Sequence, residues 1–294
     1  MINYKGEGII LNKLSDIIFF PKLYNFNYEA NTEFLGMSLM GLDLLKVVNF
    51  YENKYFEKNT IKYIGLSLIN ILEYLHYNKI IHRDIKPENI AWGIYENNNL
   101  LNKNNLYLID FGEADYIGKN FFANLNKDYF KKGTKYFMSI NTHLRGDPCP
   151  EDDIESLIYC LLYLSEKGLP WDGIKVHPSD YDKTYLEYKK KFNYYKWCGK
   201  DYEFIADILE YLRIIKTEKK TVNYHVIKTL LGHNSPYPQN DDEKNFQFCF
   251  IEDLKTSLNN ATNCKEKDNI EKEKLMRLFK GYPIDFCQFK QKFI

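Results

Sequence analysis

Helical spacing of apolar residues begins close to the start of the chain. In "EGIILNKL", residues 7–14, one carboxylate and three apolar side chains follow i, i+3, i+4, i+7 spacing, so they share one face of a helix. A longer pattern starts at Asn59, a candidate N-cap residue, and places an apolar side chain at every third or fourth position up to residue 75. We therefore predict a short helix at 7–14 and a long, half-buried helix from Asn59.

Strand-like patterns occupy two other regions. Residues 20–41 hold two strand-like runs around the polar turn "NYEANTE", followed by a candidate hinge at 38–41. The segment "NLYLIDFGEADY", 105–116, predicts an apolar strand that ends at Asp110, after which Gly112 permits a sharp change of direction.

Two more stretches differ in where their polar residues lie. Residues 152–164 are apolar nearly all round, which predicts a fully buried helix. The last sixty or so residues alternate charge densely, as in "KEKDNIEKEKLMRLFK" at 265–280, which predicts a solvated helix or tail.

Composition narrows the classes of partner. The chain has 294 residues, 45% of them hydrophobic, enough for a large core in one domain or two lobes. Forty basic and forty acidic residues cancel, so no global field favours nucleic acid or an anionic membrane. The longest apolar runs, such as 157–164, are too short to span a bilayer. Six cysteines without metal-ligand spacing predict reduced thiols, no zinc, and a cytoplasmic or nuclear location.

One loop concentrates the chemistry. "IIHRDIKPENIAWG", residues 80–93, places Asp84, Lys86 and Asn89 just after the long predicted helix. A carboxylate, an ammonium and an amide at this spacing suit a hydroxyl nucleophile, a phosphate and a metal ion. Asp110 adds a second carboxylate at the end of a strand. The pattern indicates phosphoryl transfer.

These residues stand in the order of a known family. The run 82–89 and the triplet 110–112 resemble the catalytic and metal-binding segments of eukaryotic protein kinases. "KPEN" and "GTKYF" are typical of the serine/threonine branch. "SINTHL", "DDIESLIYCLLYL" and "LPWDGIK" resemble the casein kinase one group and its vaccinia-related relatives. The resemblance runs from about residue 7 to about residue 232, and it implies an α+β fold with a largely helical C-lobe and a shortened, β-containing N-lobe.

The resemblance implies a serine/threonine protein kinase that transfers the γ-phosphate of ATP to protein hydroxyls, with ATP and Mg²⁺ as cofactors. Asp84 would orient the acceptor hydroxyl and accept its proton, Lys86 would neutralise charge on the transferring phosphate, and Thr134 would bond to both. Asn89 and Asp110 would hold the metal ion through oxygen atoms. The other residues implied at the nucleotide site are Glu7, Met37, Leu39, Ala91 and Ile109.

Three more residues take supporting roles in the resemblance. His82 is interpreted as packing, Arg83 as a partner for backbone or an anion, and Asp153 as the buried carboxylate that supports the catalytic loop. The run "PCPEDD", 148–153, stands where casein kinase one relatives have a pair of arginines, so Glu151 and Asp152 are expected to disfavour phosphorylated substrates.

The resemblance also divides the chain. Residues 1–40 are expected to form a residual N-lobe with the C helix and about two strands, 41–235 the kinase C-lobe, and 236–294 a charged extension. In the family, Glu7 would pair with a lysine on a β-strand, and a glycine-rich loop would cover the phosphates, but neither segment occurs before Glu7 in this sequence.

The chain could be a kinase from an incomplete copy of a gene whose first segment lies elsewhere, and two alternatives to a protein kinase also stay open. The first is a pseudokinase or kinase-derived scaffold, completed in trans by a kinase-like partner or self-associated through residues 7–40. The second, a small-molecule phosphotransferase, is disfavoured by Lys86 and Thr134, which resemble protein-substrate kinases.

Overall fold

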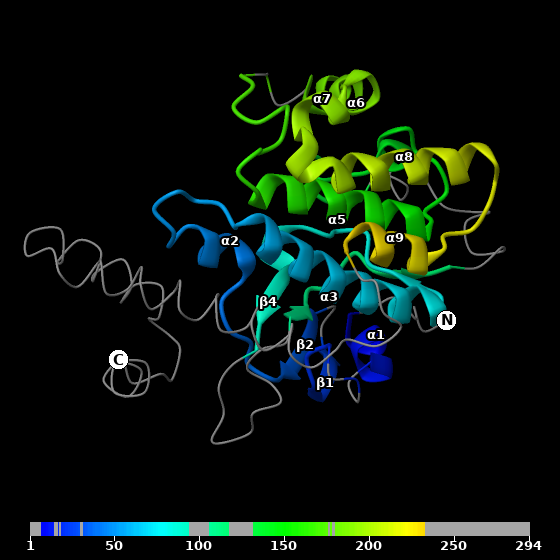
Figure 1. Ribbon diagram of the computed structural model, residues 1–294. Helices are drawn as coiled ribbons and strands as arrows, with labels where there is room; N and C mark the ends of the chain where they lie inside the picture. The colour runs from blue at the N-terminus through cyan, green and yellow to red at the C-terminus, as the bar shows by residue number, and fades with distance from the viewer. Residues whose placement is uncertain are drawn as a thin grey trace, which may run out of the picture.

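The computed structural model describes residues 7–14, 17, 19–29, 32–93, 106–117, 132–175, 177 and 180–232. The predicted extension at 236–294, with its charged segment, lies outside these residues. In the described part, a small β-containing layer with one helix lies beneath a larger stack of helices (Figure 1). The mixture of helix and strand agrees with the expected α+β class.

The small layer contains the first three elements. Helix α1 (Glu7–Leu14) forms where its spacing predicts it, and its apolar stripe is buried in the core. Strands β1 (Leu23–Glu29) and β2 (Thr32–Met37) pair antiparallel, and their register extends to Glu29 opposite Thr32. The predicted polar run therefore continues into both strands, because a hairpin with solvent-facing side chains can keep polar residues within its ladder.

The connection after β2 is fastened to the larger layer. The Gly41 N–H donates to the Trp92 carbonyl at 2.7 Å, and the Trp92 N–H donates to the Leu42 carbonyl at 3.0 Å. A Cβ on Gly41 would lie 2.7 Å from the Trp92 oxygen, so this close approach needs glycine. The candidate hinge at 38–41 thus ends at a fixed backbone contact.

The core of the larger layer is built on two helices in contact, α3 (Lys58–Tyr77) and α5 (Pro150–Leu164) (Figure 1). Helix α3 begins before the predicted Asn59, because Glu57 is its N-cap in extended backbone and its carbonyl accepts the Ile61 N–H. Helix α5 begins at Pro150, earlier than the apolar pattern, because proline suits the first helical turn.

Among the described residues 106–117, the strand predicted to end at Asp110 ends earlier, at Leu108. Only Leu106–Leu108 (β5) and Asp115–Tyr116 (β6) are strands, because Asp110 turns the chain with φ of 63°. Strand β5 pairs with β4 (Ile90–Trp92), and β6 pairs with β3 (Ile80–Ile81). The other elements are α2 (Leu44–Val48), η1 (Pro87–Asn89), α4 (Ile140–His143), α6 (Tyr181–Lys191), α7 (Tyr194–Cys198), η3 (Lys200–Tyr202), α8 (Glu203–Thr217) and α9 (Tyr224–Leu230).

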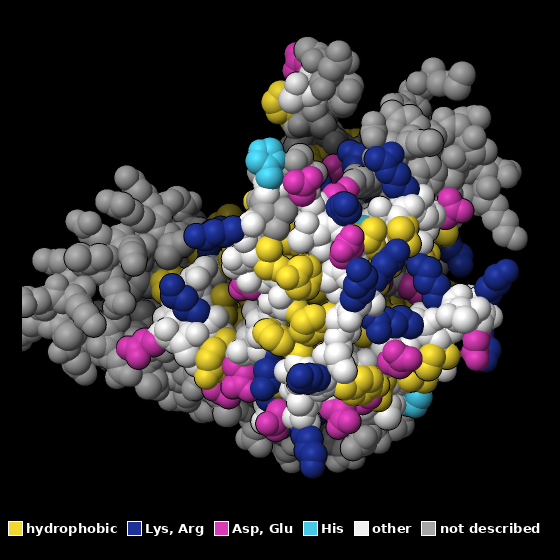
Figure 2. All heavy atoms as spheres, turned by 90° about the horizontal axis from the view of Figure 1, so that it is seen from above, with side chains coloured by type: hydrophobic (Ala, Val, Ile, Leu, Met, Phe, Trp, Pro, Cys, Tyr) yellow, Lys and Arg dark blue, Asp and Glu magenta, His cyan; other side chains and the backbone are white. Residues whose placement is uncertain are grey.

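The surfaces of the larger layer are mixed. Seen from above, basic and acidic side chains surround a cluster of apolar ones (Figure 2). Within the described residues, no helix is both long and apolar enough to cross a membrane.

Candidate active site

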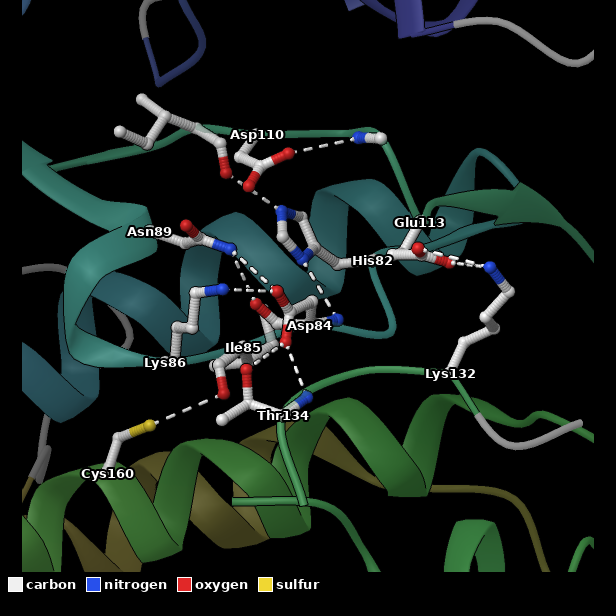
Figure 3. A network of polar contacts seen from close by, with 12 residues as sticks. His82, Asp84, Ile85, Lys86, Asn89, Asp110, Glu113, Lys132, Thr134 and Cys160 are labelled. Carbon is white, nitrogen blue, oxygen red and sulfur yellow. Dashed lines mark hydrogen bonds and ion pairs between the residues drawn. The ribbon is translucent and has the colours of Figure 1, made fainter. Parts of the chain in front are cut away.

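The loop between β3 and β4 brings three of the predicted residues together. Asp84 accepts hydrogen bonds from the Lys86 ammonium at 2.6 Å and from both the backbone N–H and the hydroxyl of Thr134, each at 2.8 Å (Figure 3). Pro87 opens the short helix η1 directly after Lys86, at the first helical position, which suits proline. Thr134, fifty positions from Asp84 in the sequence, thus helps Lys86 to hold this carboxylate.

These contacts decide the ionisation of the pair. Burial alone would raise the pKa of Asp84, but the hydrogen bonds from Lys86 and Thr134 outweigh it and hold that pKa below its ordinary value. For Lys86, burial would lower the pKa, yet the Asp84 carboxylate outweighs burial and raises it. Both side chains are therefore charged at neutral pH.

Asn89 and Asp110 place oxygen atoms near this carboxylate. The Asn89 amide nitrogen donates to the Asp84 carbonyl at 2.9 Å and to its carboxylate at 3.3 Å, which leaves the amide oxygen as the atom that can bind a cation. The Asp110 carboxylate accepts the Gly112 N–H at 3.3 Å. In Figure 3 Asp110 and Asn89 lie on the side of Asp84 away from Thr134. An amide oxygen and a carboxylate are ligands that Mg²⁺ accepts, so these residues fit the expected metal ion.

A buried carboxylate supports the loop from below. Asp153 on α5 accepts the backbone N–H groups of His82 at 2.7 Å and Arg83 at 2.8 Å, and contacts the His76 ring at 2.9 Å. Burial would raise the pKa of Asp153, but the hydrogen bond to His76, the electrostatic interaction with His76 and the hydrogen bond from the His82 N–H outweigh burial and lower that pKa. Arg83 and Asp110 adopt positive φ of 71° and 63°, a strain that the surrounding contacts must hold in place.

His82 packs in the core beneath the loop. Its ring is fully buried, lies 4.9 Å from the Phe111 ring between centroids, and contacts the Ile109 carbonyl at 3.1 Å. Burial lowers the pKa of His82, against smaller contributions from Asp153 and its neighbours, so the ring is neutral at pH 7. The geometry agrees with the packing interpretation.

Glu7 on α1 contacts the segment that carries Asp110. Its carboxylate accepts the Phe111 N–H at 2.9 Å, and the Phe111 ring packs edge-on against Phe20. This bond ties the small layer to the site. The sequence placed Glu7 at the nucleotide but gave no sign of this backbone partner.

The four apolar residues expected at the nucleotide divide into two pairs. Ala91, in β4, is buried, and the Ile109 N–H donates to the Asn89 carbonyl at 3.0 Å, so both lie beside the metal-ligand candidates. Met37 and Leu39 lie at the end of β2 and just after it, with 37% and 44% of their surface exposed. The structure thus places the second pair at the surface.

The structure corrects the expected role of Asp152 as a surface charge that disfavours phosphorylated substrates, whereas the expectation for Glu151 stays a prediction. The Asp152 side chain is buried and accepts hydrogen bonds from the Ser139 hydroxyl at 2.6 Å, the Asn141 amide at 3.0 Å and the Cys149 N–H at 3.0 Å. Burial raises the pKa of Asp152 to about 6, against these three hydrogen bonds. Asp152 therefore fixes the start of α5, since a carboxylate at the third helical position can cap the preceding N–H.

Sequence reasoning missed a glycine at the centre of the site. Gly133 has φ of 103°, and a Cβ there would lie 2.3 Å from the Arg83 carbonyl oxygen. Only glycine lets Thr134 approach Asp84 in this way. The signal was present in "GTKYF", where the glycine precedes the threonine.

His76, Tyr224 and Lys189 were also missed. The His76 ring contacts the Tyr224 hydroxyl as well as Asp153, and these residues come from three separate helices. Lys189 stands in "KKK", which looks solvated, although its side chain is fully buried.

Comparison with known proteins agrees with this geometry. The protein kinase domain family matches residues 3–200 of the chain. A probable casein kinase I homolog of Encephalitozoon cuniculi (strain GB-M1) is 30% identical over 221 residues. That alignment covers 72% of this chain, and the chain spans 65% of the length of this curated relative. The chain therefore belongs to the protein kinase domain family.

Proposed function

We propose that the protein is a serine/threonine protein kinase of the casein kinase one type. The observation that carries the proposal is the Asp84 carboxylate, held by Lys86 and Thr134 with Asn89 beside it. Similarity to a casein kinase I homolog supports the substrate class. ATP would supply the phosphoryl group, and the Mg²⁺ bound with it would neutralise charge on the phosphates.

Asp84 orients the acceptor hydroxyl and takes its proton. Because the pKa of Asp84 is lowered, this carboxylate is a weak base towards an alcohol in its ground state. The proton therefore transfers late, once the bond from oxygen to phosphorus has begun to form and has acidified the hydroxyl. The acceptor oxygen gains the phosphoryl group, and ADP leaves with the electrons of the broken bond.

Lys86, Asn89 and Asp110 act on charge. The Lys86 ammonium sits 2.6 Å from Asp84 and would stabilise negative charge on the transferring group in the transition state. The amide oxygen of Asn89 and the carboxylate of Asp110 would hold the metal ion. Glu7, through its bond to the Phe111 N–H, holds the segment that presents Asp110.

The proposed function also includes a cellular location and a class of protein partner. The described cysteines Cys149, Cys160 and Cys198 are free thiols, which supports a cytoplasmic or nuclear location. Protein partners are substrates with serine or threonine acceptors.

Self-association through residues 7–40 remains a prediction, with one correction. The apolar side chains on one face of the predicted helix at 7–14, Ile10 and Leu14 among them, would be the natural contact residues, but they are buried in the core. Contact through this region would instead use the exposed Tyr24 and Phe34, which are 67% and 55% exposed. Light scattering of the full chain and of a Phe34→Ser variant tests this self-association. A wild-type chain that is a monomer at every concentration rules self-association out.

Phosphate transfer to casein from radiolabelled ATP tests the function. The full chain should label serine and threonine only when Mg²⁺ is present, and Asp110→Asn should lower the rate about 10²-fold or more, because it removes a charge-stabilising ligand. Labelling of tyrosine alone contradicts the proposed acceptor. Absence of both transfer and Mg²⁺-dependent ATP binding contradicts the kinase proposal and favours the scaffold alternative.

A further inference from the structure

Lys189 is a buried lysine that the phosphoryl-transfer site does not use. Its side chain on α6 is 0% exposed, whereas Lys190 and Lys191, the next two residues, are exposed. A buried ammonium is unfavourable unless its protons are hydrogen-bonded. The contacts of Lys189 therefore show what it holds.

The ammonium has three acceptors for its three protons. Lys189 Nζ lies 3.0 Å from the Lys135 carbonyl, 2.7 Å from the Met138 carbonyl and 3.1 Å from His143 Nε2. His143 Nδ1 lies 2.8 Å from the Asp182 carboxylate. An ionised carboxylate can accept but not donate, so Nδ1 carries the proton in this contact and Nε2 carries the lone pair that accepts from Lys189.

Three aromatic rings surround the same nitrogen. The ring centroids of Tyr159 and Trp171 each lie 5.0 Å from Lys189 Nζ, and that of Tyr185 lies 6.0 Å away. Burial lowers the pKa of Lys189, with Glu155 opposing. The carbonyls and the ring faces favour the ammonium form, which is the only form with three protons to donate.

The carbonyls that Lys189 binds belong to the segment that begins at Thr134. The Phe137 and Met138 N–H groups donate to the Thr134 carbonyl at 2.9 and 3.0 Å. The Tyr136 carbonyl accepts from the Trp171 ring nitrogen at 3.2 Å. Residues 134–138 are thus hydrogen-bonded at one end to Asp84, through Thr134. Further along, their carbonyls accept hydrogen bonds from Lys189 and from the Trp171 ring.

We propose that Lys189 is a positioning residue for the protein substrate. The Lys189 ammonium holds the backbone carbonyls of residues 135 and 138. Because the same segment begins at Thr134, which hydrogen-bonds Asp84, the position of this segment determines where Asp84 meets the acceptor hydroxyl. The Lys135 side chain of this segment is exposed, so the segment presents an outer surface to a substrate while its carbonyls face inward. The inference rests on the proposed function, because it names what aligns the substrate in that reaction.

Lys189→Met tests the proposal, since methionine has similar length but no protons to donate, and Lys190→Met is the matched exposed control. We expect Lys189→Met to lower kcat/KM for a peptide substrate about 10- to 100-fold, as small misplacements of reacting groups do. The dissociation constant of Mg²⁺-ATP should stay within about twofold, because Lys189 contacts the substrate segment and not the metal-ligand candidates. Lys190→Met should leave both values unchanged.

Hydrogen exchange separates this inference from the proposed function. Amides at 134–138 should lose protection in Lys189→Met and keep it in Lys190→Met, whether or not the chain is an active kinase. If Lys189→Met fails to fold, Asp182→Ala serves instead, because its side chain is 21% exposed and its loss removes the acceptor of the His143 Nδ1–H, the ring whose Nε2 accepts from Lys189. Unchanged exchange at 134–138 overturns the inference. An equal loss of ATP affinity and peptide turnover also overturns it, because that pattern indicates general misfolding.

Discussion

At the residue scale, Gly133 is the position where the site has least freedom. Its φ of 103° and the 2.3 Å approach of a Cβ to the Arg83 carbonyl mean that Gly133→Ala must displace either Thr134 or the loop that carries Asp84. We expect kcat/KM to fall about 10- to 100-fold. Gly199→Ala is the control, because Gly199 also has positive φ, of 61°, but nothing lies within 4 Å of its Cβ. Equal activity in the two variants contradicts this account of Gly133.

The neighbouring carboxylates Asp152 and Asp153 should respond to pH in opposite directions. The lowered pKa of Asp153 means that its stabilising effect is complete above the unfolded value of about 3.9 and is lost as pH falls through the folded pKa. The pKa of Asp152 is raised to about 6, so its contribution is largest below about pH 4 and is lost as pH rises through 6.

Urea unfolding of the two asparagine variants measures this contrast. At pH 7, Asp153→Asn should lower the free energy of unfolding by about 3–5 kcal/mol, because it breaks a buried charged network. The cost of Asp153→Asn should shrink on acidification below about pH 4, and the cost of Asp152→Asn should grow as pH falls from 6 to 4. Parallel pH profiles for the two variants count against the assigned shifts.

At the element scale, α3, α5 and α9 meet at Gly65. A Cβ there would lie 3.0 Å from methyl carbons of both Leu161 and Leu231, so the helices approach as closely as glycine permits. We expect Gly65→Val to lower the free energy of unfolding by about 1–3 kcal/mol through overpacking. Asn70→Val, at an exposed position of the same helix, should cost less than about 0.7 kcal/mol, which reflects helix propensity alone. Equal costs in chemical unfolding mean that the contact is not tight.

The sequence predicted the elements better than their ends. Apolar periodicity located α1 and α3, because the faces that these helices bury are regular, and a stretch that is apolar nearly all round located α5. The predicted N-cap of α3, Asn59, was wrong. The N-cap is Glu57, which makes no side-chain capping hydrogen bond, and such a cap has no sequence signature. The strand around Asp110 was placed too long because a positive φ at a non-glycine residue leaves no trace in composition.

At the scale of the whole molecule, local motifs predicted Asp84, Lys86, Asn89 and Asp110 as one site, since each lies within a short run of characteristic order. Contacts between distant segments were not predictable. The bond from Glu7 to the Phe111 N–H joins residues 104 positions apart and depends on the folded arrangement of both layers. Lys189 was hidden for a similar reason, because only the fold shows which lysine of a run turns inward.

The geometry of Asp84 predicts that it acts in phosphoryl transfer and not in nucleotide binding. Single-turnover transfer from Mg²⁺-ATP to a serine peptide, measured beside ATP binding for the full chain and its Asp84→Asn variant, tests it most directly. We predict that the variant binds Mg²⁺-ATP within about threefold of wild type while its transfer rate falls about 10²- to 10⁴-fold, the usual contribution of a positioned acid or base. If Asp84→Asn transfers phosphate at the same rate as the wild-type protein, Asp84 has no role in phosphoryl transfer.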